Sequence, residues 1–446
     1  MAPNQTPFAY DAIMSAFGFD ADVLILGAGA AGLAAARKLC GARNVLILEG
    51  HDRVGGRILT HRELGRPPVD LGPEFIHGRP KETFDLLDEA GLIAVDIPFR
   101  QSDATDEPVH EDEAEWDEVD ELVEKLSDAE NEPDQSFADW LAKQNARPAV
   151  KKRAIAYIEG FNASRHDRIG VHGLIESNRE EDATDGDRQH RLVGGYDQLI
   201  DALAKSVRPP SRIESNTIVR RVAWQKGRVE VTAETPSGVR TFAGPRAIIT
   251  LPLSILQQPA DAPTGVTFAP ELPLRAALRE KMVMGRVVKI TLRFRERFWE
   301  RVAGLDVSFV NKLDAPISVW WTKLPLRMPV LVGWAGGRRA ESLPGSGREL
   351  IAVATKSLAQ IFNLTEAEIA AGIIASYAHD WQSDPFSLGA YSYIGVGGRD
   401  VPKELATPLE NTLFFAGEHT HTGLIGTVAG ALQSGYHAAG MILGNG

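Results

Sequence analysis

Three glycines near the start of the chain have the spacing of a phosphate-binding turn. In "LGAGAAG", Gly27, Gly29 and Gly32 follow an apolar run and precede an alanine-rich run. Gly27 permits the tight turn, Gly29 lets a pyrophosphate approach the backbone and Gly32 allows close helix packing. Glu49, at the end of the next apolar run, is placed to accept a hydrogen bond from a ribose hydroxyl. The pattern predicts a bound dinucleotide, and the cofactor-binding residues expected in this turn also include Ala28, Ala30 and Ala31.

A second glycine-rich stretch lies near the other end of the chain. Residues 414–435, "FFAGEHTHTGLIGTVAGALQSG", set Glu418 and two histidines between an apolar run and a helix of small residues. Glycines let the backbone approach a ligand closely. This polar elbow therefore predicts a second ligand contact, and the ligand must be identified from the rest of the sequence.

The elements that must position these glycines indicate an α/β fold. Two apolar strands flank one helix within about 30 residues, which is a βαβ unit with parallel pairing. Further strand-like runs, among them "GRVEVTAE", "RAIITLPLSIL" and "VVKITLRFRERFW", are interleaved with helical segments. Interleaving of this kind predicts an α/β sheet in at least one domain. The chain has 446 residues, which is long for one hydrophobic core, so we expect two domains.

The charge and the cysteine content narrow the class of partner. A formal net charge of -12 argues against general binding to nucleic acid or to anionic membranes, both of which need basic patches. Cys40 is the only cysteine, so it forms no internal disulfide and cannot build a metal site alone. The start of the chain lacks a signal-peptide pattern, and no run reaches about 18 uninterrupted apolar residues. We therefore expect a soluble cytoplasmic protein with a small-molecule partner and no metal.

Residues 103–134 form a dense acidic stretch. The apolar residues within it recur at three- and four-residue spacing: Trp116, Val119, Leu122, Val123 and Leu126. This spacing predicts a helix with one apolar face. A solvated acidic helix is the simpler interpretation, and a role in steering cationic ligands remains an alternative.

Several separate motifs give a resemblance to a known family. After Glu49 comes "HDRVGGRI", a second glycine pair and an arginine that one large class of FAD enzymes needs. The later motifs follow in family order: "DLGPEFIHG", "LVGGYDQLIDALA", "GRVVKITLRFRERFW", "DWQSDPFSLGAYSY" and the closing elbow. From Asp22 to its end, the chain resembles the flavin-containing amine oxidase family, which includes monoamine oxidases and polyamine oxidases.

The resemblance implies a domain organisation. A Rossmann-type FAD-binding domain of the glutathione reductase class would consist of residues 20–80, 190–270 and 385–446. A substrate domain with a mixed sheet and helices would consist of residues 81–189 and 271–384. Both ends of the chain would then share one FAD.

The resemblance also implies individual FAD contacts. Arg57 would lie at the pyrophosphate region, Glu418 at the ribityl and phosphate portion, and Val219 would reach the adenine through its backbone. Ala390 stands where relatives with covalent flavin carry a cysteine, so FAD should be bound non-covalently. The full set implied outside the first turn is Gly56, Arg57, Glu74, Phe75, Val219, Trp381, Gly417, Glu418, Thr427 and Val428.

Lys289 in "VVKITLRF" has two interpretations. Alternation places it on one strand face with Val287, Thr291 and Arg293, and that face could simply be solvated. By resemblance, however, Lys289 is the lysine that holds a water against flavin N5. That cation could polarise the water and stabilise electron density on the reduced ring. We favour the second interpretation because the flanking motifs also match.

Three further residues complete the implied catalytic set. By resemblance, Tyr391 forms one wall of an aromatic cage that guides the amine toward N5, and a core tyrosine is the alternative. Thr427 stands where some relatives carry the second aromatic wall, which leaves room for a longer or branched amine. His77 resembles a histidine of some polyamine oxidases, and a histidine that caps a loop is the alternative.

The resemblance finally implies a reaction. Hydride would pass from the amine α-carbon to N5, and the resulting imine would hydrolyse to a carbonyl product. O2 would reoxidise the flavin and yield H2O2, in a monomer or a homodimer. A desaturase or protoporphyrinogen-type oxidase is one alternative, against which Lys289 and Tyr391 argue. A non-catalytic flavin-binding interaction protein is the other.

Overall fold

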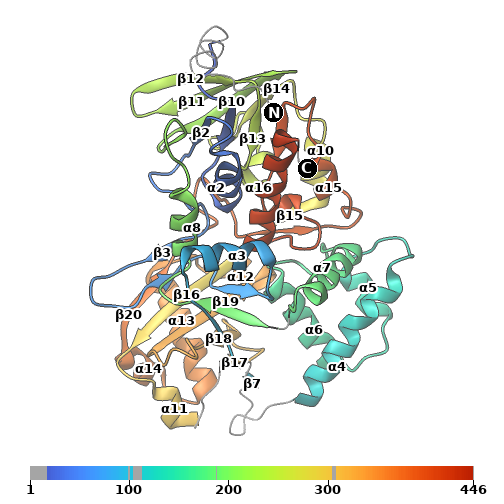
Figure 1. The fold of residues 1–446 in the computed structure, drawn as a ribbon. Coiled ribbons are helices and arrows are strands. Elements are labelled where there is room, and N and C mark those ends of the chain that lie inside the picture. The colour runs from blue at the N-terminus through green and yellow to red at the C-terminus, as the bar shows by residue number, and fades with distance from the viewer. Residues whose placement is uncertain (1–17, 99–100, 104–112, 187, 304–307, 445–446) are drawn as a thin grey trace.

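The computed structural model describes residues 18–98, 101–103, 113–186, 188–303 and 308–444. Figure 1 shows helices α2 (Ala30–Leu39) and α16 (Val428–Leu443) in one half of the molecule. Strands β16 (Val287–Phe294) and β19 (Val330–Gly336) lie in the other half, with the helices of residues 113–183 on one side of them and the helices of residues 298–303 and 347–372 on the other. The expected α/β fold class is confirmed.

A parallel five-stranded sheet forms the core of the first half. Its strands, in spatial order, are β22 (Leu413–Phe415), β13 (Ala247–Ile249), β1 (Val23–Leu26), β2 (Val45–Leu48) and β9 (Arg212–Glu214). Every residue of β1 and β2 is buried. Both strands read "VLIL" because parallel strands are covered on both faces.

Two helices from opposite ends of the chain cover this sheet. Helix α2 (Ala30–Leu39) follows the glycine turn, and α16 (Val428–Leu443) follows the closing elbow. They can approach closely because a Cβ atom at Gly435 would lie 2.2 Å from the carbonyl oxygen of Ala31. The two glycine-rich stretches of the sequence are thus brought to the same side of the sheet.

A second, antiparallel-rich sheet extends the first half. Its strands are β12 (Gly238–Gly244), β11 (Arg228–Thr235), β10 (Ile218–Gln225) and β14 (Thr267–Ala269). The pairing of β10 with β11 shifts register between Val219 and Arg221, which is an irregularity of the β-bulge type. Helices α8 (Asp197–Ala204), α9 (Leu253–Gln257), α10 (Arg275–Lys281) and α15 (Val401–Ala406) lie between the strands in sequence.

A mixed six-stranded sheet forms the core of the second half. Its spatial order is β20 (Ile373–Ala378), β16 (Val287–Phe294), β19 (Val330–Gly336), β18 (Val319–Trp321), β17 (Phe309–Asn311) and β7 (Gln101–Asp103). The even-numbered residues of β16 join one apolar core with helix α13 (Gly347–Phe362). The remaining helices on this side are α11 (Phe298–Ala303), α12 (Gly337–Glu341) and α14 (Glu366–Gly372).

A group of helices flanks that sheet: α4 (Glu113–Glu124), α5 (Phe137–Lys143), α6 (Pro148–Phe161) and α7 (Val171–Ala183). The helix predicted in the acidic stretch is confirmed. Val119, Leu122 and Leu126 are buried in the core of this group, and Trp116 and Val123 pack against it half-buried. Residues 104–112 of the stretch lie outside the described part of the chain.

Short sheets join the two halves. Strand β5 (Phe75–His77) pairs antiparallel with β8 (Gln189–Leu192), which also pairs with β6 (Ala94–Asp96), and helix α3 (Lys81–Ala90) follows β5. Strand β15 (Met282–Met284) pairs with β21 (Ser392–Ile394). Two-residue strands β3 (Thr60–His61) and β4 (Val69–Asp70) also pair. Among the described residues, no helix is long and apolar enough to cross a bilayer.

Candidate active site

One cavity of about 1750 Å³ connects the glycine turn after β1 with the mixed sheet. A typical pocket for a small ligand has about 300 to 1,000 Å³, so this cavity has room for a dinucleotide and a second molecule. Every residue expected from the sequence to contact cofactor or substrate lines it, except Ala28. Ala28 is fully buried. The roles of these residues remain predictions.

The glycine turn leaves space for a ligand at one position only. Gly27 has a φ of +111°, and a Cβ atom there would lie 2.7 Å from Oγ1 of Thr250. A Cβ atom at Gly32 would lie 2.0 Å from the carbonyl oxygen of Gly27. At Gly29 a Cβ atom would have no protein atom within 4 Å. Gly27 and Gly32 thus shape the turn, while Gly29 opens it to the cavity.

The adjoining helix end suits an anion. Gly29 is the N-cap of α2, no side chain caps it, and the first turn contains no acidic residue. Its N–H groups and the helix dipole therefore favour a negatively charged group. Glu49 accepts hydrogen bonds from the backbone N–H of Ala28 at 2.7 Å and of His51 at 2.8 Å, so its carboxylate is fixed at the cavity wall. These features fit a dinucleotide.

Glu418 holds the closing elbow against the first segment of the chain. Arg57 donates from Nη1 to Oε1 of Glu418 at 2.8 Å and to the carbonyl oxygen of Ala390 at 2.8 Å. The other carboxylate oxygen accepts from the backbone N–H of Ser392 at 3.2 Å and of Gly426 at 3.1 Å. Burial alone would raise the pKa of Glu418, but the Arg57 charge helps to hold this pKa below its usual value. The elbow thus presents a fixed, ionised carboxylate.

Lys289 lies buried at the cavity wall on β16. Its ammonium donates to the carbonyl oxygen of Gly72 at 2.9 Å and lies 3.0 Å from Oε2 of Glu74. The solvated-face interpretation of Lys289 is wrong, because all eight residues of β16 are buried. The reason is that α13 covers one face of the strand and the 70–74 segment covers the other.

Three donors that sequence reasoning missed also bind Glu74. Lys323 donates to Oε1 at 2.6 Å, Trp321 at 3.1 Å and Arg191 at 3.2 Å. Burial alone would raise the pKa of Glu74, but Lys323, Lys289 and Arg191 together hold it far below its usual value. Arg191 comes to this place because β8 pairs Arg191 with Phe75. Lys323 lies in a proline-containing loop after β18, and no sequence motif marks it as a residue of the site.

Tyr391 and a second aromatic residue form one wall of the cavity. Trp334, which sequence reasoning also missed, stacks on Tyr391 with ring centroids 6.5 Å apart and an interplanar angle of 19°. The pairing of β16 with β19 is what indicates Trp334 as a site residue, because it places Trp334 opposite Lys289. Tyr391 donates to the carbonyl oxygen of Phe161 at 2.6 Å, and Trp334 donates to that of Gly160 at 2.9 Å. The last turn of α6 is therefore bound to both rings.

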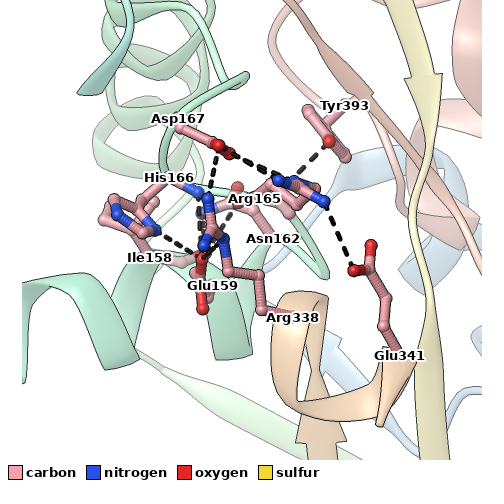
Figure 2. Close-up of polar contacts among 10 residues, drawn as sticks. Ile158, Glu159, Asn162, Arg165, His166, Asp167, Arg338, Glu341 and Tyr393 are labelled. Carbon is pink, nitrogen blue, oxygen red and sulfur yellow. Dashed lines mark hydrogen bonds and ion pairs between the residues drawn. The ribbon is translucent and has the colours of Figure 1, made fainter. Parts of the chain in front are cut away.

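Figure 2 shows a charged network that fixes the segment after α6. Glu159 on α6 contacts the His166 ring at 2.6 Å, and Arg165 pairs with Asp167 at 3.1 Å. Arg165 also pairs with Glu341 at 3.4 Å, and Arg338 pairs with Asp167, so the segment is bound to α12. The Arg165 guanidinium helps to lower the pKa of Asp167 to about 2. The network supports the position of the last turn of α6 at the cavity.

The remaining predicted residues have defined surroundings. The Thr427 hydroxyl accepts from the backbone N–H of Gly430 at 2.9 Å, so it caps α16 while it lines the cavity. His77 is half-buried with its ring edge toward Phe161, 5.5 Å between centroids, and desolvation lowers the pKa of His77 to about 4. The His77 imidazole is therefore neutral at pH 7. Trp381 donates to the carbonyl oxygen of Leu71 at 3.0 Å.

One known protein resembles this chain in sequence, and two solved structures resemble it in fold. A rice protein, polyamine oxidase 3 of Oryza sativa subsp. japonica, is 31% identical over 93% of this chain and 88% of its own length. A putrescine oxidase with bound putrescine superposes with a TM-score of 0.78 at 21% identity, over 95% of this chain and 99% of its own. Cyclohexylamine oxidase from Brevibacterium oxydans IH-35A gives a TM-score of 0.79 at 21% identity, over 95% and 98% of the two chains.

A sequence model of one family matches residues 30–443, which begin within the glycine turn and end in the last helix. The two glycine-rich stretches that meet in the fold therefore lie at the two ends of the matched region. The chain belongs to the family of flavin-containing amine oxidoreductases.

Proposed function

We propose that this protein is an FAD-dependent amine oxidase that oxidises an amine at the carbon next to its nitrogen. One observation carries the proposal: a single cavity is lined by the open glycine turn at Gly29 and also by Lys289 and the stacked rings of Tyr391 and Trp334. A dinucleotide bound at the turn and an amine beside the rings would therefore lie in the same cavity. The family membership of the chain supports the same reaction class.

The proposed cofactor site uses groups that are already fixed. Gly27, Gly29 and the first turn of α2 would take the pyrophosphate, and Glu49 the adenosine ribose. Arg57 would lie at the pyrophosphate region and Glu418 at the ribityl and phosphate portion, where the two ends of the chain meet. Bound FAD would supply an acceptor for the hydride and pass the electrons to O2, which gives H2O2. Except for Trp381, the residues that hold it would come from segments 20–80, 190–270 and 385–446, which we propose as the cofactor domain.

Non-covalent binding follows from the residue at position 390. Alanine has no nucleophilic side-chain atom, and the Ala390 carbonyl oxygen accepts a hydrogen bond from Arg57 at 2.8 Å. The single cysteine, Cys40, is the C-cap of α2 and does not line the cavity. We therefore propose that FAD is released on denaturation.

The walls would hold and orient the amine. Tyr391 and Trp334 present an apolar, electron-rich surface, and His77 is neutral at pH 7, so no cation at that place repels a protonated substrate. An amine reacts as the neutral base, because its nitrogen lone pair must support loss of hydride. Lys289 would hold a water at the reacting position through an N–H of its ammonium other than the one donated to Gly72.

We propose a slim amine with a second amino group as the substrate. Four carboxylates line the part of the cavity that lies away from Lys289, near α4, α6 and α7, and they belong to Asp117, Asp120, Glu181 and Asp314. Among the described residues, Arg153 and Lys312 are the cations that line this part, and Asp314 pairs with Lys152 at 2.7 Å. A distant ammonium would be attracted to this acidic part while the reacting amine lies at Tyr391. The rice relative named a polyamine oxidase supports this choice.

Anaerobic mixing of the purified holoprotein with a panel of amines tests the proposal. The panel compares butylamine with putrescine and with longer polyamines, and flavin absorbance reports reduction. We expect bleaching with the diamines at a higher kcat/KM than with butylamine, followed by peroxide release when O2 is admitted. Tyr391→Ala should lower kcat/KM for every amine by at least about tenfold, or about 1.4 kcal/mol.

Two outcomes would contradict the proposal. If no amine bleaches the flavin while an apolar compound with a C–C bond to desaturate does, the chain is a desaturase-type member. If dithionite reduces the flavin but no organic donor does, the bound flavin has no catalytic role of the proposed kind.

A further inference from the structure

Two buried cations behind the cavity wall, Lys323 and Arg191, share the carboxylate of Glu74 with Lys289, which lines the cavity. Glu74 and Lys289 line the cavity, whereas Lys323 and Arg191 reach Glu74 from behind and do not line it. We propose that Lys323 and Arg191 are positioning residues for Lys289, which keep its ammonium charge directed toward the cavity. The inference rests on the proposed function, because it assumes that flavin lies beside Lys289.

The two oxygens of Glu74 have different partners. Oε1 accepts from Lys323 Nζ at 2.6 Å, from Trp321 Nε1 at 3.1 Å and from Arg191 Nε at 3.2 Å. Oε2 lies 3.0 Å from Lys289 Nζ in an ion pair, and no hydrogen bond from a described residue reaches it. Three donors on Oε1 fix the rotation of the carboxylate. This rotation determines where Oε2, and therefore the Lys289 ammonium, can lie.

Arg191 is itself fixed in place. It donates to the carbonyl oxygens of Leu324 at 2.5 Å and Thr322 at 3.2 Å, on either side of Lys323. The arginine therefore holds both Glu74 and the loop that carries Lys323. The side chains of Arg191, Lys323 and Lys289 are 3%, 4% and 4% exposed, so water screens their charges little.

The charges of this group do not cancel. Three cations surround one carboxylate, and the next carboxylate to influence Lys323 and Arg191 is that of Asp70. Because the single charge of Glu74 is divided among three cations, much of the Lys289 charge remains uncompensated. Without Lys323, Glu74 would neutralise more of the Lys289 charge and draw its ammonium away from the cavity. The group thus favours negative charge at whatever ligand faces Lys289.

The reduction potential of the bound FAD tests this inference. It is measured by dye equilibration in the purified holoprotein, without any amine. Loss of the Lys323 charge should disfavour the reduced, more negative flavin. We expect Lys323→Met to lower the potential by about 30 mV or more, which is a tenfold change in a two-electron equilibrium. Lys323→Arg should restore a value near the wild type, because it keeps both the charge and the donor.

A matched control and a double variant separate positioning from other effects. Lys356→Met on α13 makes the same change in net charge at an exposed site and should leave the potential unchanged. In a Lys289→Met background, Lys323→Met should shift the potential by less than a third of its effect in the wild type. An undiminished shift in that background would mean that Lys323 acts on the flavin directly, and the positioning role would be wrong.

The remaining outcomes are also decisive. If Lys323→Met does not give folded protein, Lys323→Gln keeps an N–H donor and most of the volume, and it should also lower the potential. Potentials equal to wild type in every Lys323 variant, together with normal amine oxidation, would overturn this inference alone. A lowered potential in a protein that oxidises no amine would instead contradict the proposed function and leave the positioning role intact.

Discussion

At the scale of single residues, two buried glutamates have opposite surroundings. Glu418 binds one arginine and backbone N–H groups, so its negative charge is balanced and serves to join the two ends of the chain. Glu74 binds three cations and leaves an excess of positive charge. Both carboxyl groups have lowered pKa values despite burial. Glu418 therefore joins two segments of the chain, whereas the single charge of Glu74 is shared among three cations.

Two glycines of one turn should give separable defects. Gly29→Val should abolish FAD binding and leave the apoprotein as stable as the wild type, because a Cβ atom there meets no protein atom within 4 Å. Gly32→Val should destabilise the apoprotein itself by at least about 3 kcal/mol through overpacking, because its Cβ atom would lie 2.0 Å from a backbone oxygen. FAD content after gel filtration and urea unfolding of the apoproteins measure the two effects.

The pair of variants also provides its own control. If Gly29→Val unfolds as easily as Gly32→Val, position 29 is part of the core and the open turn is not a ligand site. If Gly29→Val retains stoichiometric FAD, the pyrophosphate lies elsewhere in the cavity.

His419 should make the protein sensitive to acid. It is fully buried, and desolvation lowers the pKa of His419 to about 4, while Glu418 opposes this shift. The unfolded chain binds the proton near pH 6.5, and the folded chain does not until about pH 4. The free energy of unfolding should therefore fall between pH 6.5 and pH 4, by about 1.4 kcal/mol for each pH unit.

Urea unfolding of the apoprotein at pH 7.5, 6 and 5 measures this contribution. His419→Gln should show a smaller loss on acidification than the wild type. His437→Gln, which changes an exposed histidine on α16, should show the wild-type loss. Equal pH slopes in all three proteins would mean that His419 is accommodated in its charged form.

At the scale of elements, regular patterns could be read from the sequence and contacts between distant loops could not. The turn after β1 and helix α2 were predicted because glycine spacing, apolar runs and helix composition lie within one stretch of chain. Trp334 was missed because its place depends on the register of β19 against β16. Lys323 was missed because it is separated from Glu74 by about half of the chain, and only the folded sheet brings the two together.

Thr427 should stabilise helix α16 as well as line the cavity. Its hydroxyl accepts from the backbone N–H of Gly430 and donates to the carbonyl oxygen of Leu424. Thr427→Ala should lower the free energy of unfolding by about 1 kcal/mol through loss of the cap. Thr427→Ser should retain wild-type stability, because serine can form the same bond. Thermal unfolding of the two apoproteins checks this, and equal losses would show that the methyl group, not the hydroxyl, is the stabilising part.

At the scale of the whole molecule, the cavity joins two separate cores. The parallel sheet supplies the open turn, the mixed sheet supplies Lys289 and Trp334, and the elbow at Glu418 fixes one to the other. The family resemblance predicted that both ends of the chain share one ligand, and the fold does bring both stretches to one cavity. The division into 20–80, 190–270 and 385–446 against the rest remains a proposal. The aromatic wall and the buried cations required the three-dimensional arrangement, because they combine residues from segments that carry no common motif.

The acidic lining of the second half should influence the capture of cationic substrates. Asp117 and Asp120 on α4 line the cavity and are exposed, so their attraction for an ammonium is screened beyond about 8 Å at physiological salt. Raising the ionic strength from low to physiological values should therefore lower kcat/KM for putrescine by about threefold or more, with a smaller change for butylamine. The double variant Asp117→Asn and Asp120→Asn should flatten the salt profile for putrescine.

Glu121→Gln with Glu124→Gln makes the same charge change on exposed positions of α4 that do not line the cavity, and it should keep the wild-type profile. If both double variants change the profile equally, attraction comes from the net charge of the molecule, and the acidic part of the cavity has no special role in selecting a second amino group.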